Sequence, residues 1–152
     1  MKRALLFFLL SCGPSTPARS AHEEEVDFGQ CLKKDWYPGV TNPRMDRVNV
    51  IVQYADQSGN FQPRDICLSI DGRPLLSTVD RATVIPRLAK KESITWRGTV
   101  SPGPHELAAH LRALGDGKDA FAHDHKSFEA KEGLIIEVTA TSPNGELQLT
   151  TK

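Results

Sequence analysis

The sequence has no long apolar run and no excess of charge of either sign. Its longest uninterrupted apolar stretch, Ala4–Leu10, has seven residues, whereas a membrane-spanning helix needs about 20. Its 19 basic and 19 acidic residues give a formal net charge of zero, and a nucleic-acid-binding surface needs clustered basic side chains. We therefore expect no membrane-spanning helix and no nucleic-acid partner.

The sequence also lacks the common catalytic motifs. It contains no G-x-S-x-G, no glycine-rich phosphate loop and no H-E-x-x-H. Serine, histidine and aspartate are present, but a catalytic triad is recognised by its geometry and not by positions along the chain. We expect a protein that is not an enzyme and needs no cofactor.

The first residues have the layout of a secretory leader. Lys2 and Arg3 form a short positive region, the apolar run Ala4–Leu10 follows, and small residues come next. The run ends in Leu9-Leu10-Ser11-Cys12, which resembles the lipobox of bacterial lipoproteins.

This resemblance implies a location in the bacterial cell envelope. Residues 1–11 would be a signal peptide, and the new N-terminal residue, Cys12, would carry a diacylglycerol and an acyl chain such as palmitate. Gly13 in the next position implies sorting to the outer membrane, on its periplasmic or its surface face. Two other interpretations are a conventional cleavage after Ser20, which would discard Cys12, and a cytosolic chain.

The rest of the chain divides into a tether, a cap and one domain. Residues 12–25 are polar and contain Pro14 and Pro17, which is typical of a flexible tether. Residues 26–46 form an N-terminal cap segment, and residues 47–152 have the length of a single domain. We expect the aromatic residues of the cap segment to cover an open end of the core, although they are also suited to an exposed partner-binding patch. These residues are Phe28, Trp36 and Tyr37.

Three cysteines leave one unpaired in an exported protein. If Cys12 carries the lipid, Cys31 and Cys67 remain, and the simplest expectation in an oxidising compartment is a disulfide between them. Closing that loop would stabilise the fold by about 3–4 kcal/mol. The alternative is a pair of free buried thiols.

From Arg47 onward, short alternating stretches separated by turn residues predict β-strands. In "RDICLSIDGRPL" the alternation places Ile66, Leu68 and Ile70 inward and Cys67 outward. "RATVIPRL" is expected to be an edge segment, because Pro86 cannot donate a hydrogen bond to a sheet. The other predicted strands are "RVNVIVQYA", "ESITWRGTV", "GLIIEVTATSP" and "GELQLTTK".

The stretch 105–114 fits two periodicities. Leu107, Leu111 and Leu114 have helical spacing, whereas Leu107, Ala109, Leu111 and Ala113 form one face of a strand. The stretch follows a predicted strand and a Pro-Gly turn, so we favour a strand and keep the helix as the alternative.

The turn motifs from about residue 65 to 150 resemble PEGA-type and other immunoglobulin-like bacterial surface domains. They are the "DG" at Asp71-Gly72, the "PG-x-H-x-L" at Pro102–Leu107 and Gly133 before a late strand. The resemblance implies an all-β fold, a single immunoglobulin-like or transthyretin-like antiparallel β-sandwich of about seven strands with at most one short helix. It also implies a non-enzymatic binding or structural role, here as a lipid-anchored component of an envelope assembly with a protein partner.

The stretch "FAHDHKSFE" contains the candidate metal ligands. In a strand, His123 and His125 would project from one face about 6.6 Å apart, close enough to share an ion. A third ligand would have to be His105, His110 or Glu129, and nothing in the sequence places any of them nearby. We therefore favour a solvent-exposed turn, and the alternative function is that of a periplasmic metal-binding protein.

Overall fold

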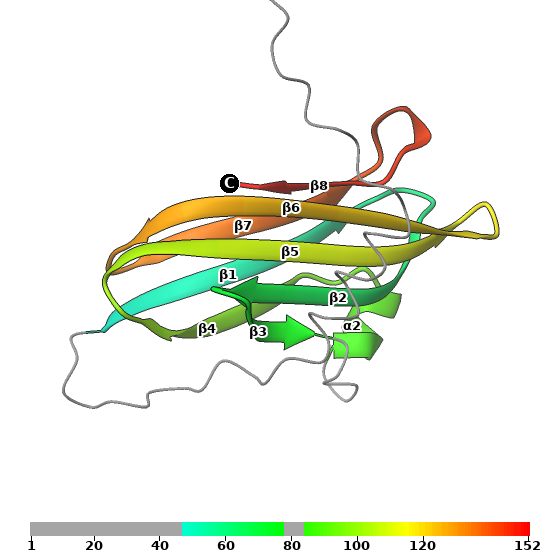
Figure 1. Ribbon diagram of the computed structural model, residues 1–152. Coiled ribbons are helices and arrows are strands. Elements are labelled where there is room, and N and C mark those ends of the chain that lie inside the picture. Colours follow the sequence, from blue (N-terminus) through cyan, green and yellow to red (C-terminus); the bar gives the residue numbers. More distant parts are fainter. Residues whose placement is uncertain (1–46, 78–83) are drawn as a thin grey trace, which may run out of the picture.

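The computed structural model describes residues 47–77 and 84–152, which form a two-layer β-sandwich (Figure 1). The expected all-β sandwich is confirmed, and the described residues contain eight strands. In chain order the elements are β1 (Val48–Gln57), β2 (Gln62–Ile70), β3 (Arg73–Ser77), α2 (Val84–Ala89), β4 (Ile94–Val100), β5 (Gly103–Gly115), β6 (Lys118–Ala130), β7 (Leu134–Thr141), the 3-10 turn η1 (Pro143–Gly145) and β8 (Gln148–Thr151).

Each layer is a sheet of four strands. One sheet has the order β4-β1-β7-β8 and the other β3-β2-β5-β6. All neighbouring strands are antiparallel, as expected, except β1 and β7, which run parallel. The chain leaves β6 at the end where β1 begins, and the Gly133 N–H donates to the Asn49 carbonyl at 3.1 Å. Strand β7 therefore starts beside the start of β1 and continues in the same direction.

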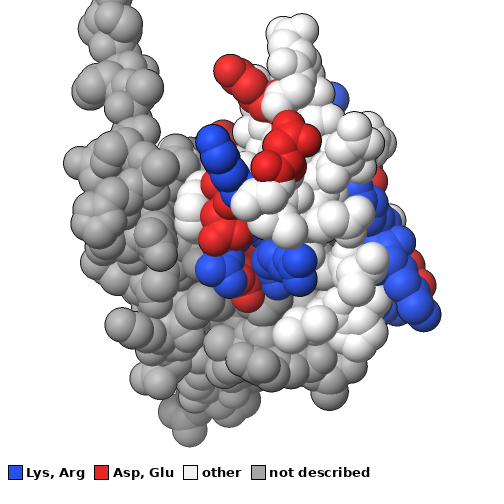
Figure 2. All heavy atoms as spheres, turned by 90° about the vertical axis from the view of Figure 1, so that its right-hand side faces the viewer, with Lys and Arg blue, Asp and Glu red and all other residues white. Residues whose placement is uncertain are grey.

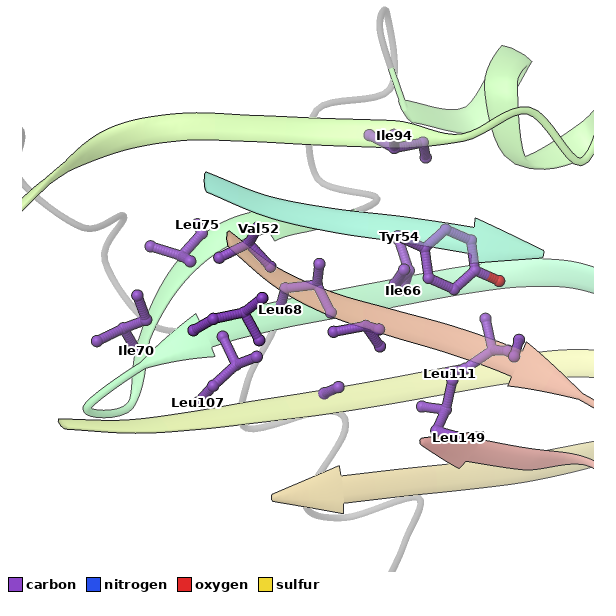
Figure 3. Packing of buried hydrophobic residues seen from close by; sticks show 14 of the residues in the cluster. Val52, Tyr54, Ile66, Leu68, Ile70, Leu75, Ile94, Leu107, Leu111 and Leu149 are labelled. Carbon is purple, nitrogen blue, oxygen red and sulfur yellow. The ribbon is translucent and has the colours of Figure 1, made fainter. Parts of the chain in front are cut away.

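The core lies between the sheets and is built by the predicted alternation. In β1, Val50, Val52 and Tyr54 are buried, and in β2, Ile66, Leu68 and Ile70 are buried against them (Figure 3). Because side chains alternate with period two, a slip of one residue in either strand would turn these apolar side chains to the other face. The hydrophobic pattern thus fixes the register of both sheets.

The ambiguous stretch 105–114 belongs to strand β5, so the helix alternative is wrong. Leu107, Ala109 and Leu111 are fully buried in the core, as period two requires and a helical period would not. Strands β5 and β6 each have 13 residues. They are joined at Asp116 and Gly117, whose φ angles of 50° and 76° suit a tight hairpin turn.

The segment around Pro86 is a helix, which corrects the expectation of an edge strand. Pro86 is the third residue of α2, within the first turn, where its missing N–H has no partner in the helix to lose. Val84 and Leu88 are four residues apart, face the same side and are both buried in the core. The helix is therefore compatible with Pro86, and the burial of Val84 and Leu88 in the core stabilises it.

A buried carboxylate fastens the end of β1 to the loops around it. Asp56 accepts hydrogen bonds from the Tyr54 hydroxyl at 3.0 Å and from the Ser58 N–H and hydroxyl at 3.0 and 2.7 Å. The Lys91 ammonium lies 3.8 Å from the same carboxylate, whose side chain is 1% exposed. Burial, together with the charge of Asp56 and its hydrogen bond, raises the pKa of Tyr54 far above its usual value, so the hydroxyl stays protonated.

Replacement of the buried carboxylate should strongly destabilise the fold. We expect Asp56→Ala to lower the free energy of unfolding by about 3 kcal/mol or more, because it leaves Tyr54, Ser58 and Lys91 without their common partner. Urea unfolding followed by circular dichroism measures the change. The control Glu146→Ala, at an exposed position, should change the free energy by less than about 0.5 kcal/mol. Equal effects of the two substitutions would contradict the role assigned to Asp56.

Candidate functional site

The predicted lipidation site and one predicted half of the disulfide, Cys12 and Cys31, lie outside the described residues, as do the tether and the cap segment with Phe28, Trp36 and Tyr37. Cys67 lies in β2, is fully buried and is disulfide-bonded. Its partner lies outside the described residues, so the pairing with Cys31 stays a prediction. A free thiol at Cys67, the alternative interpretation, is ruled out.

Three histidines form a cluster on the outer face of the β5–β6 hairpin. In the register of the hairpin, His110 lies opposite His123, and Ala108 lies opposite His125. The ring centres are 6.3 Å apart for His110 and His123, 5.8 Å for His110 and His125, and 5.9 Å for His123 and His125. The expectation that "FAHDH" is an exposed turn is therefore wrong, since these residues are in the middle of a strand.

The three side chains of this histidine cluster (His110, His123 and His125) differ in their exposure to solvent. His110 is 8% exposed, whereas the side chain of His125 is 43% exposed and its Nδ1 lies 3.5 Å from a carboxylate oxygen of Glu106. Within residues 47–77 and 84–152, no group of three or more His, Cys, Asp or Glu side chains could hold a metal ion.

The sequence supplied two members of the cluster and left the third undecided. Of the three candidates, only His110 lies beside His123 and His125. His105 is engaged at another turn, and Glu129 lies opposite Pro104 near the far end of the hairpin. Only the pairing of β5 with β6 brings residues 110 and 123 together, so no local pattern could have identified His110.

A second array, missed in the sequence, joins Asp71, His105 and Ser101. The His105 Nδ1 lies 2.6 Å from an Asp71 carboxylate oxygen, and its Nε2 lies 3.3 Å from the Ser101 hydroxyl and 2.9 Å from the Ser101 carbonyl. The other Asp71 oxygen accepts the Glu106 N–H at 3.0 Å. The residue types are those of a serine hydrolase triad, so the array has to be tested for that chemistry.

The hydrogen bonds of His105 argue against nucleophile activation. Burial by itself would lower the pKa of His105, but hydrogen bonds to Asp71 and to the Ser101 carbonyl, with the charges of Asp71 and Glu129, outweigh it and raise the pKa. An imidazolium donates from both nitrogens, which matches a carboxylate on one side and a carbonyl on the other. A general base needs a free Nε2 lone pair. We therefore name this array the Asp71–His105 clamp and assign it a structural role.

A hollow lies among the loops at one end of the sandwich. It has a volume of about 300 Å³ and is open to solvent. Figure 2 faces this loop end, where basic and acidic side chains are interspersed over the described surface. Three connections contribute its lining, the β1–β2 loop, the β5–β6 hairpin and the β7–β8 turn. The lining residues are Gly59, Asn60, Phe61, Gly115, Asp116, Ser142 and Gly145.

Comparison of the chain with protein-family models, with curated proteins and with solved structures finds no match. The resemblance to lipoproteins and to PEGA-type domains therefore stays a prediction. Within the described part of the chain, no helix is long and apolar enough to cross a membrane.

The Asp71–His105 clamp should make stability depend on pH. Because the folded pKa of His105 is raised, its contribution is complete below the ordinary histidine pKa of about 6.5 and is lost as the pH rises through the folded pKa. We expect Asp71→Asn to cost about 1 kcal/mol at about pH 5.5, a modest value because the Asp71 side chain is 47% exposed. The cost should shrink at about pH 9.

Urea unfolding of the two proteins at both pH values measures this difference. Asparagine preserves the acceptor for the Glu106 N–H, so the comparison isolates the charge of Asp71. Glu146→Gln, at the exposed residue that follows η1, is the matched control and should show no pH-dependent difference. A cost of Asp71→Asn that is the same at both pH values would contradict the clamp.

Proposed function

We propose that this protein is a lipid-anchored, non-enzymatic component of a bacterial envelope assembly, with the sandwich as its partner-binding or structural domain. The observation that carries the proposal is the disulfide bond of Cys67. Structural disulfides persist in oxidising compartments and are rare in the cytosol. The bond therefore supports export, which the leader and the lipobox-like sequence before Cys12 predict independently.

The layout of the sandwich supports display on a membrane. The described chain enters at the start of β1, near Asn49 and Gly133, which we call the entry end (Figure 1). Strand β1 has ten residues and spans about 33 Å before it reaches the loop end, where Gly59 lines the hollow. A lipid at Cys12 would then be joined to the domain through the tether and the cap segment, which the predicted Cys31–Cys67 disulfide would fasten to β2, and the hollow lies at the end of the sandwich opposite the start of β1.

The side chains at the loop end suit contact with a protein. The hollow is lined by backbone-rich loops, one aromatic ring, Phe61, and one carboxylate, Asp116. Loops held by a rigid sandwich are a common location for binding residues. The non-enzymatic role is supported by the Asp71–His105 clamp, because both ring nitrogens of His105 are occupied, one by Asp71 and the other by the Ser101 carbonyl.

The anchor is tested by the mass of the protein taken from bacterial membranes. We expect a mature chain that starts at Cys12 and is heavier by a diacylglycerol and an acyl chain, and a Cys12→Ser variant that is released from the membrane. Non-reducing peptide mapping should link Cys67 to Cys31. A chain that begins at residue 21, or a peptide in which Cys67 is linked to Cys12, would exclude the lipid anchor.

The partner-binding end is tested by photo-crosslinking in intact cells. A photoreactive amino acid at Asn60 or Asp116, both exposed at the loop end, should give an adduct of defined mass. The same amino acid at Lys131 or Glu132, exposed at the entry end, is the matched control and should not give that adduct. If only the positions at the entry end gave adducts, the partner would bind at the entry end, which would contradict the proposed binding surface at the loop end.

A further inference from the structure

We propose that the cap segment, residues 26–46, crosses the outer face of the β3-β2-β5-β6 sheet and is fastened to the middle of β2 by a disulfide between Cys31 and Cys67. The cap segment would then cover a face of the sandwich and not an open end of its core. This inference shares the disulfide of Cys67 with the proposed function. It requires neither a lipid at Cys12 nor a partner at the loop end.

Side chains on the outer face of this sheet are buried over β2 and β5. The core-facing residues of β2 alternate with Cys67 and Ser69, which therefore point to the outer face. Cys67 is 0% exposed and Ser69 is 3% exposed. His110, which lies opposite Cys67 on β5, is 8% exposed. Side chains that point away from the core are buried to this extent only when another part of the chain covers them.

The outer face of the other sheet serves as an internal comparison. Its central strands are β1 and β7, and there Asn49, Ile135 and Glu137 point outward and are exposed, Ile135 to 51%. Along the described length of these two strands, no outward side chain is buried. Because β2 and β5 are also central strands, their position in the sheet does not explain why their outward side chains are buried.

The described elements do not supply this cover. The helix α2 directs Val84 and Leu88 into the core between the sheets. Strand β8 approaches this sheet at the edge strand β6, where the Thr151 N–H donates to the Asp124 carboxylate at 2.6 Å. Both elements therefore contact the core side or an edge of the sheet. We infer that the cover over Cys67 comes from the chain outside residues 47–77 and 84–152.

The disulfide of Cys67 identifies the covering segment. The chain has three cysteines, and the other two, Cys12 and Cys31, both precede β1. Bonded cysteines have Cβ atoms about 3.8 Å apart, so either partner would bring the N-terminal part of the chain onto the outer face at Cys67. Residues 78–83 contain no cysteine. Cys31 is the partner that leaves Cys12 for the lipid, and it belongs to the cap segment.

The connection from Cys31 to β1 is long enough for this path. Residues 32–46 lie between Cys31 and Arg47, and a fully extended chain of that length spans about 50 Å. Cys67 lies three residues before the end of β2 at Ile70, a distance of about 10 Å, and packed sheets are about 10 Å apart. The connection therefore needs about half of its reach, and the cap segment can lie along the outer face before the chain enters β1.

Exposure across the sheet marks the border of the covered area. On β6, His123 is half-buried, the side chain of His125 is 43% exposed, and Ser127 is exposed. His110 and His123 each also have an interaction beyond the ring contacts of the histidine cluster. The cap segment would therefore run over β2 and the middle of β5, reach His123 and leave His125 open to solvent.

The position of the cap segment is tested by photo-crosslinking within the full chain, purified in its oxidised form. A photoreactive amino acid at Ala108, half-buried on the outer face opposite Ser69, should become linked to a peptide from residues 26–46. The same amino acid at Ile135, on a central strand of the other sheet, is the matched control and should not. Absence of the link from position 108, or equal links from both positions, would overturn the proposal.

The role of the disulfide is tested by the rate at which diethyl pyrocarbonate modifies individual histidines, measured by peptide mass spectrometry. His110 is 8% exposed, and so is the side chain of His105. We expect Cys31→Ser to raise the rate at His110 severalfold, because the cap segment can then leave the sheet. The rate at His105 should not change, because the Asp71–His105 clamp holds this ring. An unchanged rate at His110 would contradict the fastening by Cys31.

The two measurements remain informative if the variant is unstable or the anchor proposal fails. Crosslinking from Ala108 is carried out with both cysteines in place, so it does not depend on the folding of Cys31→Ser. A mass that shows no lipid at Cys12 would leave the expected crosslink and modification rates unchanged. Loss of the crosslink would in turn not bear on lipidation or on adducts from the loop end, so the two proposals fail separately.

Discussion

The register of β5 between β2 and β6 is the constraint on which most of this structure depends. Its inner face places Leu107 and Leu111 in the core, opposite Ile70 and Ile66 of β2. The outer face of the same strand carries His110, with Cys67 on one side and His123 on the other. Because side chains alternate, a slip by one residue would expose the core and disperse the histidine cluster in a single step. Packing therefore holds the candidate site in place.

Two polar arrangements secure the two ends of the sandwich. At the entry end, His105 ties the Asp71 turn, which joins the paired strands β2 and β3, to the connection at Ser101, which leads from β4 in one sheet to β5 in the other. At the loop end, the Asp56 carboxylate accepts hydrogen bonds from Tyr54 in β1 and from Ser58 in the following loop, and it forms an ion pair with Lys91 after α2. A buried charge is tolerated only when it is paired and hydrogen-bonded, so each arrangement also specifies how the loops fold.

Anchoring and partner binding concern different parts of the protein. The proposed anchor lies in the chain before β1, and the proposed partner-binding surface is formed by the loops around the hollow. Cys67 relates export to the histidine cluster, because its disulfide supports export and its position in β2 is the cross-strand neighbour of His110.

The sequence by itself determined the strands whose apolar residues alternate and the turn at Asp71-Gly72, where both residues have positive φ angles. These features depend on neighbours a few residues apart, so local patterns are sufficient. The sequence did not determine the helical state of the Pro86 segment. This helix is stabilised only when Val84 and Leu88 pack against a core that distant strands build. The parallel pairing of β1 with β7, the Asp71–His105 clamp and the placement of His110 beside His123 were decided by the tertiary structure alone. Each of them joins residues that only long-range strand pairing brings into contact.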